Sequence, residues 1–108
     1  MRSFIRQAAV LAAFQIASAA LALAGQAVQI KINSLAFAPT EVTARVGDTV
    51  EWVNEDFIDH TATAKNGDFD VTIPAGQSAQ LQLTHAGTIE YFCRFHPNMT
   101  AKIQITHD

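Results

Sequence analysis

Short runs in which apolar and polar residues alternate fill the chain beyond residue 27. The alternation is clear in residues 28–32 (Val-Gln-Ile-Lys-Ile) and 42–46 (Val-Thr-Ala-Arg-Val). A period of two puts every second side chain on one face of a strand, so each run predicts a strand with one buried face. Turn signals, Gly-Asp at 47–48 and Asn-Gly at 66–67, separate the runs. Seven or eight such strands predict an all-β fold, an antiparallel β-sandwich.

The same pattern gives the remaining elements and a core. Further strands are predicted at 50–54, 60–64, 69–73, 79–83, 88–92 and 100–106, with loops at 33–39 and 93–99. The inward positions of these strands make up the predicted core, which consists of Val50, Trp52, Leu81, Leu83, Tyr91, Ile103 and Ile105. The alternation leaves open which of Tyr91 and Phe92 points inward.

Residues 1–24 differ from the rest of the chain. Arg2 and Arg6 precede an alanine-rich apolar stretch without acidic residues, and residues 22–24 (Ala-Leu-Ala) suit signal peptidase. We therefore predict a signal peptide at 1–24, cleaved as late as residue 27, and one domain at 28–108. Export predicts a periplasmic protein without stable membrane insertion. A retained anchor is the alternative, but the apolar run is short for a spanning helix and contains polar residues.

The charge balance narrows the class of partner. Of the seven basic residues, two lie in the predicted signal peptide, which leaves five against ten acidic residues and a net charge near −5. Nucleic acid requires a basic surface, so we expect no nucleic-acid partner. The acidic residues Glu55, Asp56 and Asp59 are predicted to form a solvated loop, with docking to a basic partner as the alternative. We expect a monomer.

The chain has one cysteine, Cys93. A lone thiol in a small exported domain cannot form an internal disulfide, so it is either a buried apolar residue or a ligand or nucleophile. His96 and Met99 follow at intervals of three, and a tight loop can direct a thiol, an imidazole and a thioether to one point. These donors match a blue-copper electron-transfer site, which needs a second imidazole. His60, next to the loop at 55–59, is the candidate.

Two segments resemble the copper loops of the cupredoxin family, in its amicyanin and plastocyanin branch. They are Asn54-x-Asp56-x-x-x-His60-Thr61 and Cys93-x-x-His96-x-x-Met99. The resemblance implies an eight-stranded Greek-key sandwich that shuttles one electron through a single type 1 copper ion, with redox proteins as partners. The ligands that it implies are His60, Cys93, His96 and Met99. Where the family often has asparagine after the first histidine, this chain has Thr61, whose hydroxyl is the expected replacement.

Other functions compete with electron transfer. A periplasmic copper carrier or buffer would use the same ligands. A Cys-His nucleophilic pair would make the protein an enzyme, but no third orienting residue stands out, so we expect no catalysis. Zinc accepts cysteine and histidine, but a methionine ligand argues against it. His85 and His107 are predicted to be solvated. An apolar surround for His96 is predicted from Phe37, Phe57, Phe95 and Pro97, with Phe37 and Phe57 as alternative core residues.

Overall fold

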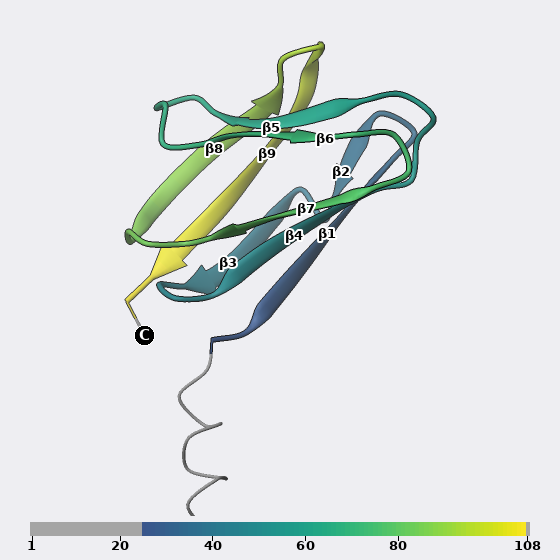
Figure 1. Ribbon diagram of the computed structural model, residues 1–108. Helices are drawn as coiled ribbons and strands as arrows, with labels where there is room; N and C mark the ends of the chain where they lie inside the picture. Colours follow the sequence, from purple (N-terminus) through teal and green to yellow (C-terminus); the bar gives the residue numbers. More distant parts are fainter. Residues whose placement is uncertain (1–24, 108) are drawn as a thin grey trace, which may run out of the picture.

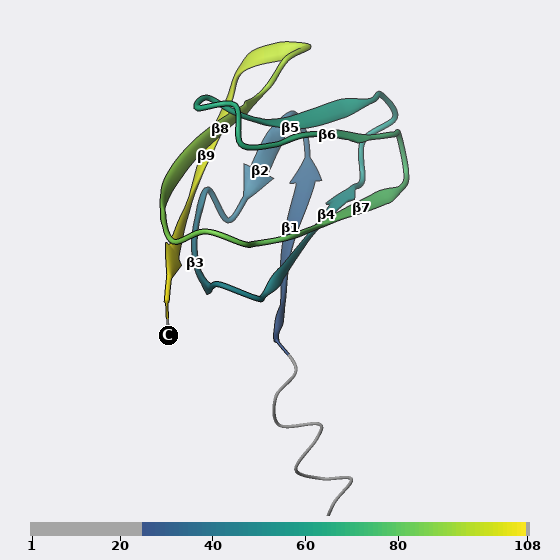
Figure 2. The same cartoon turned by 60° about the vertical axis from the view of Figure 1, so that its left-hand side comes forward.

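The computed structural model describes residues 25–107, which form two facing β-sheets (Figures 1 and 2). The strands are β1 (Ala27–Asn33), β2 (Ala36–Ala38), β3 (Glu41–Arg45), β4 (Thr49–Asn54), β5 (His60–Ala64), β6 (Asp70–Ile73), β7 (Ser78–Gln82), β8 (Gly87–Cys93) and β9 (His96–Thr106). Within residues 25–107, no helix is long and apolar enough to cross a membrane. The predicted signal peptide, residues 1–24, lies outside the described residues.

The strand order confirms the predicted all-β sandwich. The first sheet has the order β2-β1-β4-β7 and the second has the order β3-β9-β8-β5-β6. The chain passes from one sheet to the other after β2, β3, β4, β6 and β7. These crossings place two pairs of neighbouring strands parallel to each other. β1 pairs with β4, and β3 with β9, in parallel, so the predicted purely antiparallel pairing is wrong for these two pairs.

Both long loops of the prediction are shorter in the structure. The loop predicted at 33–39 contains β2, which pairs with β1 and leaves only Ser34 and Leu35 in the turn. The loop predicted at 93–99 is also a tight turn, because Cys93 pairs directly with His96 and β9 begins there. Only residues 94–95 lie between the two strands. Strand β2 has only three residues, which is too short for a visible alternation of apolar and polar residues. Residues 96–99 (His-Pro-Asn-Met) do not alternate in this way, so the start of β9 could not be predicted from the sequence either.

Aromatic side chains fill the space between the sheets. Tyr91 is fully buried, and its ring packs edge-on against Phe37 at 4.8 Å and Trp52 at 5.7 Å between ring centroids. Burial raises the pKa of Tyr91 to about 12, although Trp52 Nε1 donates a hydrogen bond to its hydroxyl. The predicted core residues are buried, except Leu81, which is half-buried. Tyr91 therefore points inward and Phe92 is half-buried.

Three connections meet at one end of the sandwich (Figure 1). They are the β1–β2 turn, the β4–β5 loop at 55–59 and the β8–β9 turn at 94–95. Hydrogen bonds tie the first two together, and the side chains that flank the other two approach one another. We call this end the loop end. Of the predicted metal ligands, His60, Cys93 and His96 are the strand residues that border its loops, and Met99 lies three residues farther along β9.

Candidate metal centre

Three of the predicted ligands converge on one point. His60 begins β5, Cys93 ends β8 and His96 begins β9, and these strands are neighbours in the second sheet. Cys93 Sγ lies 3.7 Å from His60 Nδ1 and 3.7 Å from His96 Nδ1. The three donor atoms lie within 4.8 Å of one another. His60 and Cys93 are fully buried and His96 is half-buried, so the centre is closed toward the core and opens only beside His96.

These spacings fit a metal ion. Metal–thiolate and metal–imidazole bonds of about 2.3 and 2.0 Å, the lengths found for zinc, separate sulfur from nitrogen by roughly 3.7 Å at a trigonal angle. The two sulfur–nitrogen distances have this value. The two imidazole rings are edge-on to each other, with centroids 5.1 Å apart and planes inclined at 61°. The geometry therefore suits one thiolate and two imidazoles in a trigonal arrangement.

Thr61 holds the cysteine side of the centre. Its backbone N–H donates to Cys93 Sγ at 3.3 Å, and its hydroxyl oxygen accepts a hydrogen bond from Arg94 N at 2.8 Å. A donor directed at sulfur stabilises the thiolate, which is the form that binds metals. The hydroxyl contact fixes the first residue of the β8–β9 turn. The structure thus gives Thr61 the supporting contact that was predicted for it.

The Thr61 hydroxyl also starts a chain of hydrogen bonds that ends at the surface. It lies 2.9 Å from Thr63 Oγ1, which donates to Asp70 Oδ1 at 2.7 Å. Arg94 Nε lies 3.1 Å from the same carboxylate oxygen. The hydrogen bonds from Thr63 and Arg94 hold the pKa of Asp70 below its usual value. Because Thr63 uses its proton on Asp70, Thr61 must donate to Thr63, which leaves its lone pairs for Arg94 N.

Asp56 holds the histidine side, and the prediction of a fully solvated acidic loop is wrong for this residue. Its side chain is 15% exposed, and its Oδ2 lies 2.8 Å from His60 Nε2. Burial opposes ionisation, but hydrogen bonds from Leu35, His60 and Ser34 outweigh it and keep the pKa of Asp56 below the usual value. Asp56 therefore stays charged beside His60.

Asn54 organises the loop that carries Asp56. It is buried, and its side-chain amide donates to the carbonyls of Ile58 and Ile73 while its Oδ1 accepts from Asp56 N. Each of these bonds satisfies a backbone group that the loop would otherwise leave without a partner. The sequence placed Asn54 in the motif without indicating this role. The spacing of an asparagine two residues before an acidic residue is the one signal that could have suggested it.

Met99, the predicted fourth ligand, lies in β9 and is buried. Its position three residues after His96 stays the basis for the prediction that its thioether is the axial ligand. Pro97, between the two, is exposed.

Large apolar side chains lie exposed on all three connections of the loop end. Leu35 is 49% exposed, Phe57 is 99% exposed and Phe95 is 51% exposed. Arg94 places its guanidinium over the Phe95 ring, 5.4 Å from the ring centroid. Phe37, by contrast, is 2% exposed and belongs to the core. The sequence left open whether Phe37 and Phe57 lie in the core or on the surface. The structure places Phe37 in the core and Phe57 on the surface.

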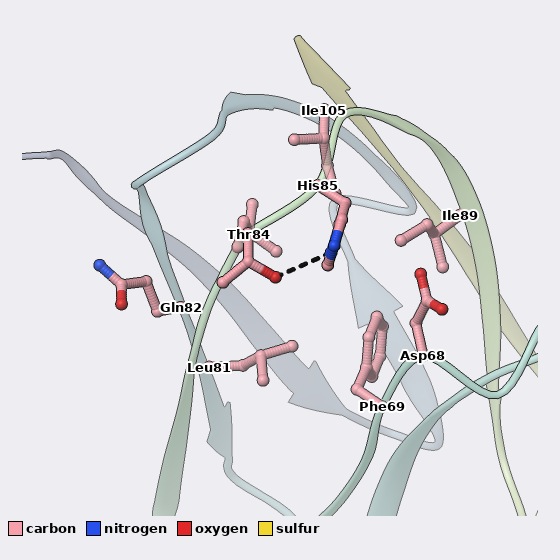
Figure 3. A pocket seen from close by; sticks show the side chains of 9 residues that line it. Asp68, Phe69, Leu81, Gln82, Thr84, His85, Ile89 and Ile105 are labelled. Atoms are coloured by element: carbon pink, nitrogen blue, oxygen red, sulfur yellow. Dashed lines mark hydrogen bonds between the residues drawn. The ribbon is translucent and has the colours of Figure 1, made fainter. Parts of the chain in front are cut away.

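A pocket of about 150 Å³ lies at the opposite end of the sandwich (Figure 3). It is lined by Asp68, Phe69, Leu81, Gln82, Leu83, Thr84, His85, Ile89 and Ile105. His85 is exposed there and its Nδ1 lies 2.9 Å from Thr84 Oγ1, so it takes no part in the metal centre. His107 is exposed at the end of the described chain. Among the described residues, only His60, Cys93 and His96 form a cluster with metal-ligand spacing.

Known proteins resemble the chain along most of its length. The family model for the cupredoxin-like domain matches residues 6–105. Amicyanin-alpha from Methylorubrum extorquens is 32% identical over 112 aligned residues, which cover 91% of this chain and 94% of that protein. The crystal structure of amicyanin from Paracoccus versutus superimposes with a TM-score of 0.65 at 30% identity, covering 73% of this chain and 80% of that one.

A further solved structure bears on the metal. It is a reduced Cu(I) form of an amicyanin mutant, with a TM-score of 0.65 and 28% identity, covering 73% of this chain and 81% of the other. The matching fold, the donor cluster and the sequence relatives all agree. The chain therefore belongs to the cupredoxin family and is amicyanin-like within it.

Proposed function

We propose that this protein is a small exported blue-copper protein that carries one electron at a time. The observation that carries the proposal is the spacing of the three donor atoms, with Cys93 Sγ at 3.7 Å from the Nδ1 atoms of His60 and His96. A thiolate, two imidazoles and a thioether are the donors of a blue-copper centre, and Met99 would supply the thioether as the fourth ligand. Bound copper would supply a one-electron couple between Cu(I) and Cu(II).

The chain's own residues favour fast electron exchange. His60 and Cys93 are buried in paired strands. The Thr61 N–H donates a hydrogen bond to Cys93 Sγ, and the Asp56 carboxylate accepts one from His60 Nε2, so both donors are held in place. Ligands that are fixed in this way need little rearrangement when the charge of the centre changes. With copper bound, the burial of His60 and Cys93 would disfavour the more highly charged oxidised state and would raise the reduction potential. Preorganised donors of this kind are what an electron carrier requires.

We further propose that the electron leaves through the half-buried edge of His96. The exposed side chains of Leu35, Phe57 and Phe95 surround the loop end and would exclude water from a contact with a redox partner. Both donor and acceptor would then use one apolar face.

Two competing functions have weaker support. A copper carrier must expose its ligands for exchange with an acceptor, but His60 and Cys93 are fully buried. An enzyme with Cys93 as nucleophile would need a substrate to reach the same buried thiol. Reversible oxidation and reduction with copper retained would favour the electron carrier. Transfer of copper to an acceptor apoprotein would favour the copper carrier.

The visible spectrum of the chain lacking residues 1–24 tests the proposal after loading with Cu(II). We expect a strong thiolate-to-copper charge-transfer band that is abolished by Cys93→Ser and weakened or shifted by His60→Ala. His85→Ala is the matched control, because it removes an exposed imidazole at the opposite end, and it should leave the band unchanged. A protein that binds copper without colour would contradict the proposal.

A further inference from the structure

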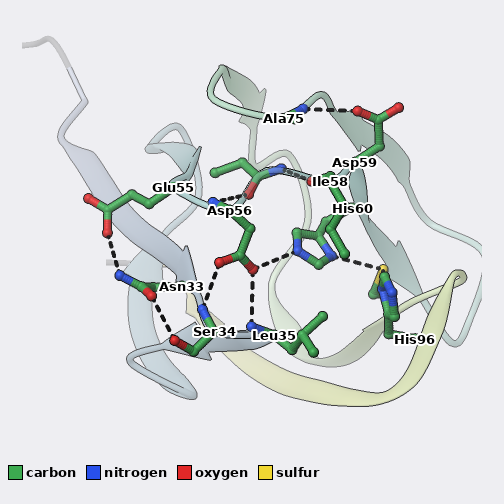
Figure 4. Close-up of polar contacts among 12 residues, drawn as sticks. Asn33, Ser34, Leu35, Glu55, Asp56, Ile58, Asp59, His60, Ala75 and His96 are labelled. Carbon is green, nitrogen blue, oxygen red and sulfur yellow. Dashed lines mark hydrogen bonds and ion pairs between the residues drawn. The ribbon is translucent and has the colours of Figure 1, made fainter.

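The carboxylate of Asp56 makes contacts in two directions (Figure 4). Oδ2 lies 2.8 Å from His60 Nε2 and accepts the backbone N–H of Leu35 at 3.0 Å. Oδ1 accepts the backbone N–H of Ser34 at 2.7 Å. One half-buried side chain therefore contacts both a predicted metal ligand and the β1–β2 turn. Its own backbone N–H donates to Asn54 Oδ1, which fixes the position of the carboxylate.

On the ligand side, Asp56 determines which nitrogen of His60 is free. An ionised carboxylate can only accept, so Nε2 must carry the proton and Nδ1 presents its lone pair to the space beside Cys93. His60 is fully buried, and Nδ1 lies 3.7 Å from Cys93 Sγ. The carboxylate thus sets both the tautomer and the orientation of the ring.

On the turn side, Asp56 compensates for an unfavourable sequence. Ser34 and Leu35 have φ of 54° and 62°, and Asn33 pairs with Ala36 across the turn. A two-residue hairpin turn with two left-handed residues strongly prefers Asn-Gly, because side chains with a Cβ are strained there. Here the turn is Ser-Leu, and both of its backbone N–H groups donate to Asp56. Asn33 is also held from the same loop, since its side-chain amide donates to Glu55.

We propose that Asp56 is a positioning residue that joins the metal ligand His60 to the β1–β2 turn, and so fixes a ligand and the exposed Leu35 together. The part that concerns copper rests on the proposed function. Without this carboxylate, the imidazole loses its orienting acceptor and the turn loses the two hydrogen bonds that hold its strained backbone. The loop end therefore presents its partner-facing surface in a conformation that is tied to the ligand geometry.

The substitution Asp56→Asn tests the ligand side in the copper-loaded chain. Asp59→Asn is the matched control, because it removes the same charge from the same loop, where Asp59 Oδ1 accepts the backbone N–H of Ala75 at 2.9 Å. We expect Asp56→Asn to weaken copper binding by about 10-fold to 100-fold. The reduction potential should rise above those of the wild type and the control, because a negative charge beside the oxidised centre is lost. Equal potentials and affinities in both variants would overturn this half.

Amide hydrogen exchange tests the turn side in the copper-free chain. In Asp56→Asn only one side-chain oxygen remains as an acceptor, so at least one of the Ser34 and Leu35 amides should exchange on the order of 10-fold to 100-fold faster than in Asp59→Asn. Unchanged exchange would overturn the link to the turn. This readout needs no metal, so a wild type that fails to bind copper would contradict the proposed function without deciding the turn.

A second variant keeps the test valid if Asp56→Asn folds poorly. Leu35→Gly removes the Cβ at a position with φ of 62°, so it should restore the folding of the doubly substituted chain. The potential of the double variant is then compared with that of Leu35→Gly alone. A higher potential in the double variant supports the role of Asp56 at His60, and an equal potential overturns it.

Discussion

Single side chains decide how the donors of the centre are held. Thr61 is fully buried, and its hydroxyl oxygen accepts the backbone N–H of Arg94 at the start of the β8–β9 turn. A buried donor that loses its acceptor lowers stability by its full desolvation penalty. The hydroxyl of Thr61 therefore supports the turn between Cys93 and His96 directly, through its hydrogen bond with Arg94 N.

We expect Thr61→Val to lower the free energy of unfolding by about 1–3 kcal/mol, because Arg94 N is left without an acceptor while the shape of the side chain is kept. Chemical denaturation of the copper-free chain measures this change. Thr72→Val is the control, since Thr72 is the exposed cross-strand partner of Thr61 and should change stability by less than about 0.5 kcal/mol. Equal stability of the two variants would show that the Arg94 contact contributes nothing.

Asp48 makes stability depend on pH. Hydrogen bonds from the backbone N–H groups of Gln26 and Arg45 lower the pKa of this buried carboxyl in the folded chain. A folded-state pKa below the unfolded value means that unfolding takes up a proton, so stability rises with pH. The contribution of Asp48 is complete above the unfolded pKa of about 3.9 and is lost as the pH falls toward the lowered folded value.

We therefore expect the copper-free chain to lose stability as the pH falls below about 5, and Asp48→Asn to flatten this decline. At neutral pH the same substitution should lower the free energy of unfolding by about 1–3 kcal/mol, because one of the two backbone donors loses its acceptor. Denaturation at pH 7 and pH 3.5 measures both effects. A decline as steep in the variant as in the wild type would assign the acid sensitivity to other carboxylates.

At the scale of elements, the short strand β2 carries one of the largest core side chains. Phe37 is 2% exposed and packs against Tyr91, although its strand has only three residues. Phe57, on the β4–β5 loop, is 99% exposed. Two phenylalanines that the sequence could not separate thus have opposite roles, one in packing and one on the surface.

We expect Phe37→Ala to lower the free energy of unfolding by about 3–5 kcal/mol, because it leaves a cavity in the core. Phe57→Ala should change it by less than about 0.5 kcal/mol. If Phe57 contacts redox partners as proposed, its removal should instead slow electron exchange with a protein partner and leave exchange with a small inorganic oxidant unchanged. Thermal or chemical denaturation and stopped-flow kinetics measure these effects. A large loss of stability in Phe57→Ala would contradict the exposed position.

The elements also show what the sequence can predict. Strands with four or more alternating residues, such as β1, β4 and β7, are found where the alternation predicts them, because burial of one face repeats along the strand. The donor cluster was predictable because Cys93 and His96 lie in one short segment. Pairings between distant segments leave no local pattern, so the parallel strand pairs and the contacts of Asp56 with Ser34 and Leu35 appear only in the fold.

The fold of the whole molecule holds the three donor residues in position without a metal. One core extends between the sheets, and His60, Cys93 and His96 all belong to paired strands. The Thr61 N–H donates to Cys93, and the Asp56 carboxylate accepts from His60. A centre held by strands and hydrogen bonds differs from a small zinc domain, in which the metal itself organises the chain. The fold should therefore not depend on the metal.

We expect the copper-free chain lacking residues 1–24 to unfold cooperatively and to keep the circular dichroism of a β-protein. Copper should then raise the free energy of unfolding by mass action, by about 4 kcal/mol at a free concentration 1,000 times the dissociation constant, and the midpoint of thermal unfolding should rise with it. Cys93→Ser should fold but lose most of this gain. Calorimetry with and without a chelator measures both, and an unfolded copper-free chain would contradict the prediction.

The donors His60, Cys93 and His96 all lie in the second sheet, on β5, β8 and β9. The first sheet supplies none of these three donors, and its β1–β2 turn is joined to them through the contacts of Asp56 with Ser34, Leu35 and His60. In protein engineering, the outward face of the first sheet could accordingly be redesigned for attachment to an electrode or a fusion partner. The colour of the copper-loaded protein would then report whether the coordination of the metal is intact.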